Sequence, residues 1–539
     1  MSATTTPPPD EVDLAVDTGR LENTSRLRIY AVLALIVLMT EVVPVQYTMI
    51  TPALHDMSAT FPDVGANINW IVILIGLVGA SATPLLGKMS DIWGKKLLFV
   101  ACGVLFVVGS LIDAVTSNWT LFLIGRGLQA FAVASQFIAF GLIRDLMPRR
   151  FVATALGFVG AGIGIAAAIA PVIGGVLLDH FSWRSLFWSL GGFTALMTLL
   201  VVLVVPESKL KVRDRIDPFG AVLLSVGTLL VLLYLDNGQS WGWGRATSIA
   251  WLIGGLVLLA LFFVVETRVS RPMVDLRLLL NPKVSMVLLM SFFGVGIIAI
   301  QPLTLAYMTQ TPNADGLRDQ VAQGVVAKAH EMTGATLPVD MVKVVVDPSY
   351  SYGNGFTMLQ YALHVGLWAG LVAVIAGPLG GWLSHRYGAR IPAIAGFAVN
   401  VVAGLGYILV DYSWATYSVF YALSGIGFGF FYAAVANLVV DAVPQEQQGI
   451  STGMLGVTIN LGTAVSLAVV TALLNNNPIK ANIDVMGNHA VQPIPQVFAD
   501  SGYTQTFWLA LGTAVIALVL GVLLRHGRAA ARGGAEHAE

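Results

Sequence analysis

Two charged residues stand inside long apolar runs of the sequence, where a charge needs a chemical reason. Glu41 lies about midway along a run near 29–51, and Arg126 lies within another near 119–142. A buried carboxyl can take up and release a proton near neutral pH, and a permanent guanidinium can polarise a neighbouring carboxyl or water. We predict that both residues take part in proton coupling. The alternatives are a protonated carboxyl in a structural hydrogen bond and a fixed ion pair between helices.

Two further titratable residues lie in apolar surroundings. Asp113 is close to one end of the run near 97–116, so we expect it at the membrane interface and not at a reactive site. His364 is an isolated histidine, which is more often structural than functional. The single cysteine, Cys102, cannot form an intrachain disulfide and is expected to be an inert buried thiol.

The composition places these residues in a membrane protein. Of 539 residues, 56% are hydrophobic and 11% are charged, whereas about a quarter are charged in ordinary soluble domains. Such a chain cannot supply the polar surface of a soluble protein, but its apolar side chains suit contact with lipid. The net charge of −1 gives no sign of a nucleic-acid partner.

Fourteen apolar runs are long enough to cross a bilayer as helices, which takes about 20 residues each. They lie near 29–51, 69–87, 97–116, 119–142, 152–178, 185–205, 217–236, 247–265, 284–308, 357–381, 391–411, 414–440, 450–474 and 505–524. We expect residues 1–26 to be a disordered cytoplasmic tail without the layout of a cleaved signal peptide, and 525–539 to be a second cytoplasmic tail.

The basic residues predict the orientation in the membrane. With the N-terminus inside, 22 of the 29 lysines and arginines lie on the cytoplasmic side, and Arg126 lies within a span. Six lie outside: Arg184, Arg245, Arg318, Lys328, Lys343 and Lys480. Because basic residues favour the cytoplasmic side, we predict a multi-pass protein of the cell (inner) membrane with both termini in the cytoplasm.

A loop pattern repeats within the chain. The segment 84–96 recurs 294 residues later as 378–390, with Pro, Leu, Gly, Ser, a second Gly and a final basic residue at matching places. Both copies follow the second span of a six-span set. We therefore predict two six-helix bundles, 27–206 and 284–524, joined by a linker (207–283) that contributes two extra membrane helices.

Three motifs in this order resemble those of a known family. Gly87-x3-Asp91-x2-Gly94-Lys95-Lys96 is similar to the signature between helices two and three of the major facilitator superfamily. Arg126-Gly127-Leu128-Gln129-Ala130 resembles its R-x-x-Q-G motif, and Ala170-Pro171-Val172-Ile173-Gly174-Gly175 resembles its antiporter motif. The chain resembles the fourteen-helix drug:proton antiporter branch. This implies an all-α polytopic membrane protein with the major facilitator fold, built from two six-helix bundles plus two extra helices.

The resemblance also implies roles for residues. Asp91 is expected to latch the cytoplasmic face, with Arg144 as a partner, and the antiporter-type motif at Ala170, Pro171, Gly174 and Gly175 is expected to be a bending point. The branch usually carries an acid in span one, and on the matching register Gln46 takes its place. Glu41 is the only carboxylate of that span.

Polar and aromatic side chains within the runs are the predicted lining of a substrate cavity, although each can equally make a contact between helices. They are Gln46, Tyr47, Gln129, Gln136, Gln301, Tyr307, Gln360, Tyr361, His364, Trp368, Phe431, Tyr432, Asn437 and Asn460. The segment 309–356 is predicted to be an extracytoplasmic insertion with a short helix over 317–332. The alternatives for this segment are a tolerated insertion, a cap over the exit and a docking site for an envelope partner.

These observations favour a monomeric secondary active exporter that exchanges lipophilic or amphipathic small molecules, such as drugs, for protons. We expect no enzymatic activity, metal or cofactor, because the driving force is the proton gradient. No G-x-x-x-x-G-K-[ST] motif is present to bind a nucleotide. The alternatives are an exporter of an endogenous lipid or metabolite, a solute importer, and a non-transporting membrane sensor or assembly partner.

Overall fold

The computed structural model describes residues 19–22, 24–58, 60–61, 64, 70–211, 218–268, 281–334, 338–347, 349–443, 448–485 and 488–528. The first half contains α1 (Arg26–Thr40), α2 (Val42–Ser58), α3 (Trp70–Trp93), α4 (Lys95–Val115), α5 (Trp119–Ala130), α6 (Val133–Leu146), α7 (Arg149–His180) and α8 (Arg184–Val204). Two helices follow, α9 (Pro218–Trp241) and α10 (Ala246–Glu266). Most of the two predicted terminal tails lies outside the described residues.

The second half adds helices and a small sheet. Its elements are α12 (Pro282–Gln310), α13 (Ala314–Thr333), η2 (Val339–Met341), β1 (Val342–Val346), α14 (Met358–Tyr361), the π-helical turn η3 (Ala362–Gly366), α15 (Leu367–Tyr387), α16 (Arg390–Leu409), α17 (Trp414–Ala442), α18 (Gln448–Asn475), β2 (Pro478–Val485), β3 (Asn488–Phe498) and α19 (Asp500–Leu523).

The helices agree with the predicted fourteen spans. Thirteen helical stretches in the described residues are long and apolar enough to cross a membrane, with α1 and α2 together forming one of them and α5 and α6 another. The remaining predicted span is α9, which contains the shorter apolar stretch Val222–Leu235. The predicted all-helical membrane fold is therefore confirmed.

The break within the first span follows from a proline. Pro44 has no N–H, so the carbonyl of Thr40 receives no bond from it and the helix is interrupted there. As a result α1 ends at Thr40, and α2 begins at Val42. Glu41 occupies the interruption.

The internal repeat has the same geometry in both halves. Gly94 and Gly388, at matching places in the two copies of the loop, have φ angles of 123° and 92°. The basic residue that closes each copy contacts the sixth helix of its half: Lys96 Nζ donates to the carbonyl of Val202 in α8 at 2.9 Å, and Arg390 Nε donates to Gly521 in α19 at 3.1 Å. We call this end of the bundle the motif end.

Closely packed glycines join the two halves. A Cβ on Gly157 of α7 would lie 2.3 Å from the carbonyl oxygen of Gly377 in α15, and one on Gly164 would lie 2.7 Å from the carbonyl oxygen of Gly370. Backbone therefore meets backbone along this contact, as small residues permit in membrane proteins. Asn437 Nδ2 also crosses the boundary, donating to the carbonyl of Ala153 at 3.2 Å.

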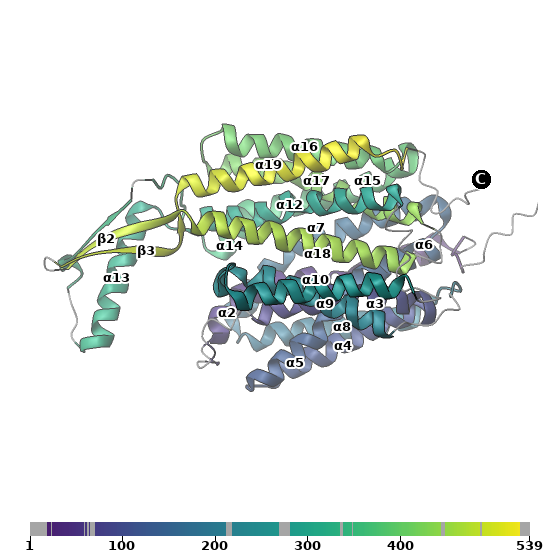
Figure 1. Cartoon of the computed structure of the whole chain (residues 1–539), viewed down its shortest axis with the longest axis horizontal. Helices are drawn as coiled ribbons and strands as arrows, with labels where there is room; N and C mark the ends of the chain where they lie inside the picture. Colours follow the sequence, from purple (N-terminus) through teal and green to yellow (C-terminus); the bar gives the residue numbers. More distant parts are fainter. Residues whose placement is uncertain are drawn as a thin grey trace, which may run out of the picture.

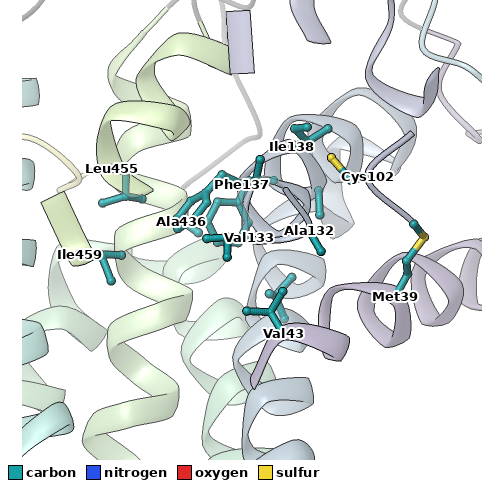
Figure 2. Close-up of a cluster of buried hydrophobic side chains, with 14 of the residues drawn as sticks. Met39, Val43, Cys102, Ala132, Val133, Phe137, Ile138, Ala436, Leu455 and Ile459 are labelled. Carbon is teal, nitrogen blue, oxygen red and sulfur yellow. The ribbon is translucent and has the colours of Figure 1, made fainter. Parts of the chain in front are cut away.

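Apolar side chains complete this boundary. Figure 2 shows Val133 and Phe137 of α6 facing Ala436 of α17 and Leu455 and Ile459 of α18 within one buried cluster. The same cluster contains Cys102, which is 1% exposed, as expected for an inert core thiol. One continuous core thus spans both halves.

The segment after α12 folds with a second segment that the sequence interpretation missed. A helix is present as predicted within 309–356, where α13 covers Ala314–Thr333. Strand β1 from this insertion pairs antiparallel with β2, and β2 pairs with β3, so the hairpin between α18 and α19 belongs to the same unit. We call α13, β1, β2 and β3 the hairpin module. Figure 1 shows β2, β3 and α13 projecting beyond the end of the bundle where α19 begins, which we call the hairpin end.

The hairpin module is fixed to the bundle by aromatic residues. The hydroxyl of Tyr352 donates to the carbonyl of Phe498, and its ring lies 4.7 Å from that of Tyr503 in α19. Burial raises the pKa of Tyr352 to about 12, so its hydroxyl stays protonated and keeps donating. Buried residues of α12, the sheet and α19 form one hydrophobic cluster, which makes the module continuous with the second half.

The turn at Gly94 generates a stability prediction. Gly94→Ala should lower the free energy of unfolding by about 1–3 kcal/mol, because its φ of 123° strains any residue with a Cβ. That Cβ would also lie 2.8 Å from Glu207 Oε2. Unfolding by SDS in mixed micelles would measure the change. Gly192→Ala in α8, where a Cβ meets nothing within 4 Å, is the control and should not destabilise. Equal effects of the two substitutions would contradict this reasoning.

Candidate functional site

Arg126 lies at the centre of a buried polar cluster in the first half. Its side chain is 1% exposed. Its Nε donates to the carbonyl of Ile71 in α3 at 2.8 Å, and its Nη1 donates to Gln46 Oε1 in α2 at 3.2 Å and to Gln129 Oε1 in α5. A guanidinium has five N–H donors and no acceptor, so these three carbonyl oxygens suit it. The acceptors come from three different helices.

A second layer of contacts completes the cluster. Gln129 Nε2 donates to Ser110 Oγ of α4 at 2.9 Å, which orients the amide oxygen towards Arg126. The Arg126 guanidinium also lies 5.7 Å from the centre of the Phe187 ring. We call Arg126, Gln46, Gln129, Ser110 and Asp113 the arginine cluster.

Asp113 belongs to this cluster and is buried in the bundle near the end of α4, and its predicted depth at the membrane interface stays a prediction. Its side chain is 0% exposed, and its carboxylate and the Arg126 guanidinium attract each other. Gly125 makes room for it, because a Cβ there would lie 2.0 Å from Asp113 Oδ1. Within the described residues neither carboxylate oxygen has a hydrogen-bond partner. Asp113 is therefore an acid held inside the protein near a permanent cation.

Glu41 occupies a different site from Arg126. It is 5% exposed, and its Oε1 accepts a hydrogen bond from the Thr40 hydroxyl at 3.2 Å. A Cβ on Gly162 of α7 would lie 2.3 Å from this oxygen, and Tyr432 of α17 interacts electrostatically with the carboxyl. Oε2 has no hydrogen-bond partner among the residues that the structure describes. Glu41 thus lies where the first half meets the second.

At position 46 the chain departs from the family that it resembles, because it has Gln46 and not an acid. The resemblance places an acid there, and an acid would form an ion pair with the guanidinium. Gln46 instead gives Arg126 a neutral amide oxygen and is itself 0% exposed. In this chain the acid that interacts electrostatically with Arg126 is Asp113 on α4.

The motif from Gly87 to Lys96 contributes to a buried ion cluster at the motif end. Lys95 Nζ lies 3.3 Å from Asp91 Oδ1 and 3.0 Å from Asp145 Oδ2, and all three side chains are at most 2% exposed. Ser208 Oγ donates to the same Asp145 oxygen at 2.6 Å. Arg144, next to Asp145, is also buried, and its predicted pairing with Asp91 stays a prediction.

Glu207 completes the motif end by capping a helix. Its carboxylate accepts hydrogen bonds from the backbone N–H groups of Lys96 at 2.9 Å and Leu97 at 3.2 Å in the first turn of α4. An acid at a helix N-terminus satisfies unpaired donors and the helix dipole. The sequence interpretation missed Asp145, Glu207 and Ser208. Glu207 lies just after the predicted span 185–205, in Pro206-Glu207-Ser208. An acid at this position is the sequence signal that could have indicated a helix cap.

The antiporter-type motif lies within one uninterrupted helix. Ala170, Pro171, Gly174 and Gly175 are all part of α7. Ala170 is 1% exposed, and a Cβ on Gly174 would lie 3.4 Å from the Cα of Met49, so this face packs against α2. A role in bending stays a prediction.

The residues predicted to line a cavity separate into buried and exposed groups. Those with described inward contacts are Gln46 and Gln129 in the arginine cluster, Gln301 bonded to Ser424, Tyr361 bonded to the carbonyl of Pro302, Asn437 bonded to Ala433, Asn460 bonded to Gly456, and Phe431 and Tyr432 packed on each other. Tyr47 and Gln136 are partly buried, and Tyr307 lies at the hairpin end.

Three predicted cavity residues are exposed instead. Gln360 lies beside Thr357 at the start of α14, and His364 packs against Phe356 and Trp414. Trp368 is 49% exposed and shares a stripe of α15 with Leu371 and Ile375, which are also exposed. An exposed apolar stripe on a membrane helix suits contact with lipid, so the placement of Trp368 does not support a cavity-lining role. For Gln360 and His364 that role stays a prediction.

The ion cluster at the motif end generates a prediction. Lys95→Met should lower the free energy of unfolding by about 3 kcal/mol, because Asp91 and Asp145 lose a buried cation. Lys96→Met, at the adjacent and partly exposed position, should cost less than about 1 kcal/mol. SDS titration in mixed micelles measures both. Adding Asp145→Asn to Lys95→Met should restore part of the loss, and a double variant less stable than Lys95→Met would contradict the pairing.

Comparison with known proteins agrees with this architecture. A sequence profile described as Major Facilitator Superfamily matches residues 36–314 and 332–539. The chain is 30% identical over 281 residues to "Uncharacterized MFS-type transporter YvkA" of Bacillus subtilis, covering 51% of this chain and 62% of YvkA. It is 24% identical to "Multidrug resistance protein Stp" of Mycobacterium tuberculosis, covering 79% of this chain and 72% of Stp.

The fold also matches a solved transporter. The structure of the human organic anion transporter MFSD10 (TETRAN) superimposes with a TM-score of 0.61 at 13% identity, covering 92% of this chain and 99% of that one. At this identity the likeness concerns the fold alone. Together with the profile match over most of the chain, it shows that this chain is a multi-pass membrane transporter of the Major Facilitator Superfamily.

Proposed function

We propose that the protein is a secondary active exporter that exchanges protons for lipophilic or amphipathic small molecules by alternating access. The observation that carries the proposal is the arginine cluster. A permanent cation, 1% exposed, is held by neutral amides with an acid nearby, and a second acid lies at the boundary between the halves. Charges of this kind inside a membrane protein mark ion pathways and proton relays.

The contacts of the two acids support a change of protonation state. Glu41 has one bonded oxygen and one without a partner in the described part of the chain, and both Asp113 oxygens are without hydrogen bonds there. A carboxyl with a purely structural role would have hydrogen-bond partners for both oxygens, because a buried polar group without a partner costs free energy. Glu41 and Asp113 can exchange protons without breaking a fixed network.

The proton gradient supplies enough energy for such export. One charge moving through 100 mV releases about 2.3 kcal/mol, and each pH unit adds about 1.4 kcal/mol. Together they sustain a concentration ratio on the order of 10²–10³ for a one-to-one exchange.

The direction of export follows from the proposed orientation. The sequence assigns 22 of the 29 basic residues to the cytoplasmic side, among them Lys95, Lys96 and Arg390 of the motif end, so in this proposal the motif end faces the cytoplasm and the hairpin end faces outward. Location in the cell (inner) membrane with both termini in the cytoplasm, and a monomer as the working unit, belong to the same proposal. The relative Stp is named a multidrug resistance protein, which supports a lipophilic drug as substrate. An endogenous lipid or metabolite on the same fold is the alternative.

Flux through reconstituted proteoliposomes tests the proposal. A pH gradient should drive movement of the lipophilic dye Hoechst 33342 by the wild type, and collapse of the gradient should stop accumulation. Dye binding without gradient-driven flux in any condition would contradict the proposal and favour a sensor or assembly partner. Gradient-driven flux of a labelled native lipid without any dye flux would favour the endogenous exporter.

The role of Glu41 has a sharp expectation. Glu41→Gln keeps a side chain of the same size but cannot change its charge. The gradient should therefore no longer accelerate dye flux, while dye binding is retained. Asp319→Asn on the exposed face of α13 is the control and should leave the response to the gradient unchanged. Coupled flux at the wild-type rate in Glu41→Gln would remove Glu41 from the mechanism.

The role of Asp113 can be tested separately from that of Glu41. Asp113 interacts electrostatically with Arg126, whereas the described interactions of Glu41 do not include Arg126. Asp113→Asn should lower the rate of coupled flux, and Arg126→Gln in the same chain should partly restore it by removing the cation that lost its counter-charge. Such rescue is measured as the flux of the double variant relative to Asp113→Asn. A double variant no faster than the single one would argue that the two residues act independently.

A further inference from the structure

A cavity lies at the hairpin end, between the bundle and the hairpin module. Its volume is about 710 Å³, within the range of sites for drug-sized molecules. One wall is the last two turns of α12, including Leu303 and Tyr307, and the opposite walls are α13 and the hairpin of β2 and β3. Tyr307 is one of the residues that the sequence predicted to contact substrate.

The position of this cavity relative to the membrane makes its lining unusual. Helix α12 has 29 residues and is therefore about 43 Å long, whereas the apolar layer of a bilayer is about 30 Å thick. The helix is therefore longer than the layer, and the hairpin module, which forms the other walls of the cavity, projects beyond the end of the bundle (Figure 1). The cavity thus faces the aqueous or headgroup region, where lipid contact does not account for apolar walls.

The walls are nevertheless mostly apolar. Strand β2 alternates strictly, with Ile479, Ala481 and Ile483 buried and Lys480 and Asn482 exposed, and Ala481 and Ile483 face the cavity. Leu317 and Val321 of α13 line the other side. An apolar hollow beyond the membrane is typical of a ligand site, because open apolar surface in water is otherwise unfavourable.

The polar groups of the lining suggest the kind of ligand. Gln310, Gln320 and Gln492 offer neutral amides, and Lys328 of α13 is the single charged residue among those that line the cavity. Lys328 is exposed, so it stands at the rim and not in the depth. One cation beside an apolar hollow favours a molecule with an apolar body and one anionic head.

We propose that this cavity is an exit site that holds a lipophilic monoanion after it leaves the bundle. The apolar body lies between Tyr307 of α12 and Ile483 of β2, and the anionic head lies at Lys328. The cavity adjoins the second half, because its wall on α12 begins at Leu303, two residues after the buried Gln301. This inference rests on the proposed export towards the hairpin end, and it names an acidic amphiphile as a substrate class.

Site-directed alkylation of the full-length protein tests the cavity. Gly324→Cys places a thiol in the lining, where a Cβ meets nothing within 4 Å, and Ala327→Cys places one on the same helix away from the lining. The native Cys102 is buried and reports unfolding if it reacts. Decanoate is the anionic probe and decanol is the neutral probe of equal chain length, with a water-soluble maleimide as the reagent.

Decanoate should slow alkylation of Gly324→Cys about sixfold at five times its Kd, because bound probe covers the thiol. Ala327→Cys should react at an unchanged rate. Equal rates with and without decanoate at Gly324→Cys, or equal slowing at both positions, would overturn the site.

The charge of the ligand is tested by a second substitution in the Gly324→Cys chain. Adding Lys328→Gln should raise the decanoate concentration needed for protection about threefold and leave decanol unaffected, since an exposed ion pair contributes modestly. If decanoate and decanol protect equally well, both with Lys328 in place and after Lys328→Gln, the anionic class is overturned.

The two proposals fail separately. Protection of Gly324→Cys in a preparation whose proteoliposomes show no gradient-driven flux of dye, labelled native lipid or decanoate would leave the binding site standing and refute proton-coupled export. Gradient-driven flux without protection would refute the exit site alone.

Discussion

The first half of the protein is organised by the need to satisfy one buried guanidinium. Arg126 is 1% exposed, so its donors must be met mainly by protein groups. The acceptors come from α2, α3 and α5, and Ser110 of α4 orients one of them. Displacing any of these helices would leave a donor unpaired at a cost of about 1–3 kcal/mol or more. The mutual positions of four helices are thus fixed by a single side chain.

The boundary between the halves is built on a different principle. Gly157 and Gly164 of α7 meet the backbone of α15, and the remaining contact is largely apolar, with Phe137 seated against Gly456. Backbone surfaces in van der Waals contact resist separation by many small attractions and by few hydrogen bonds, such as that of Asn437 to Ala153. The glycine and apolar contacts described here can part and close again without breaking an ion pair. Rigid halves and a separable boundary are what alternating access requires.

Hydropathy and the repeat predicted most of the fold because both depend only on the order of residues along the chain. A run of apolar residues predicts a span wherever it occurs, and the recurrence of Gly94 at Gly388 reflects a φ angle that favours glycine in both halves. The burial of Asp113 could not be predicted in this way. A residue near the end of a span faces water, lipid or protein depending on neighbouring helices, and Gly125, which makes room for it, lies on another helix. The hairpin of β2 and β3 was predictable in principle, since Ile479, Ala481 and Ile483 alternate with polar residues. Its pairing with β1, more than 130 residues earlier in the chain, was not, because periodicity carries no information about partners.

The replacement of the expected acid by Gln46 changes how charge is distributed over the two halves. An acid at that position would neutralise Arg126 on contact, and its protonation would be felt mainly within the first half. With Gln46 in place, Arg126 keeps its charge and acts on Asp113 through the low-dielectric interior, where electrostatic attraction extends further than in water. Glu41 stands apart from this pair, against Gly162 and Tyr432 at the boundary. An ionised carboxylate there requires water or a partner, whereas a neutral carboxyl is compatible with close packing. In the proposed exporter, protonation of Glu41 therefore favours the closed boundary and its loss favours separation, while Asp113 balances the fixed charge that keeps the first half intact.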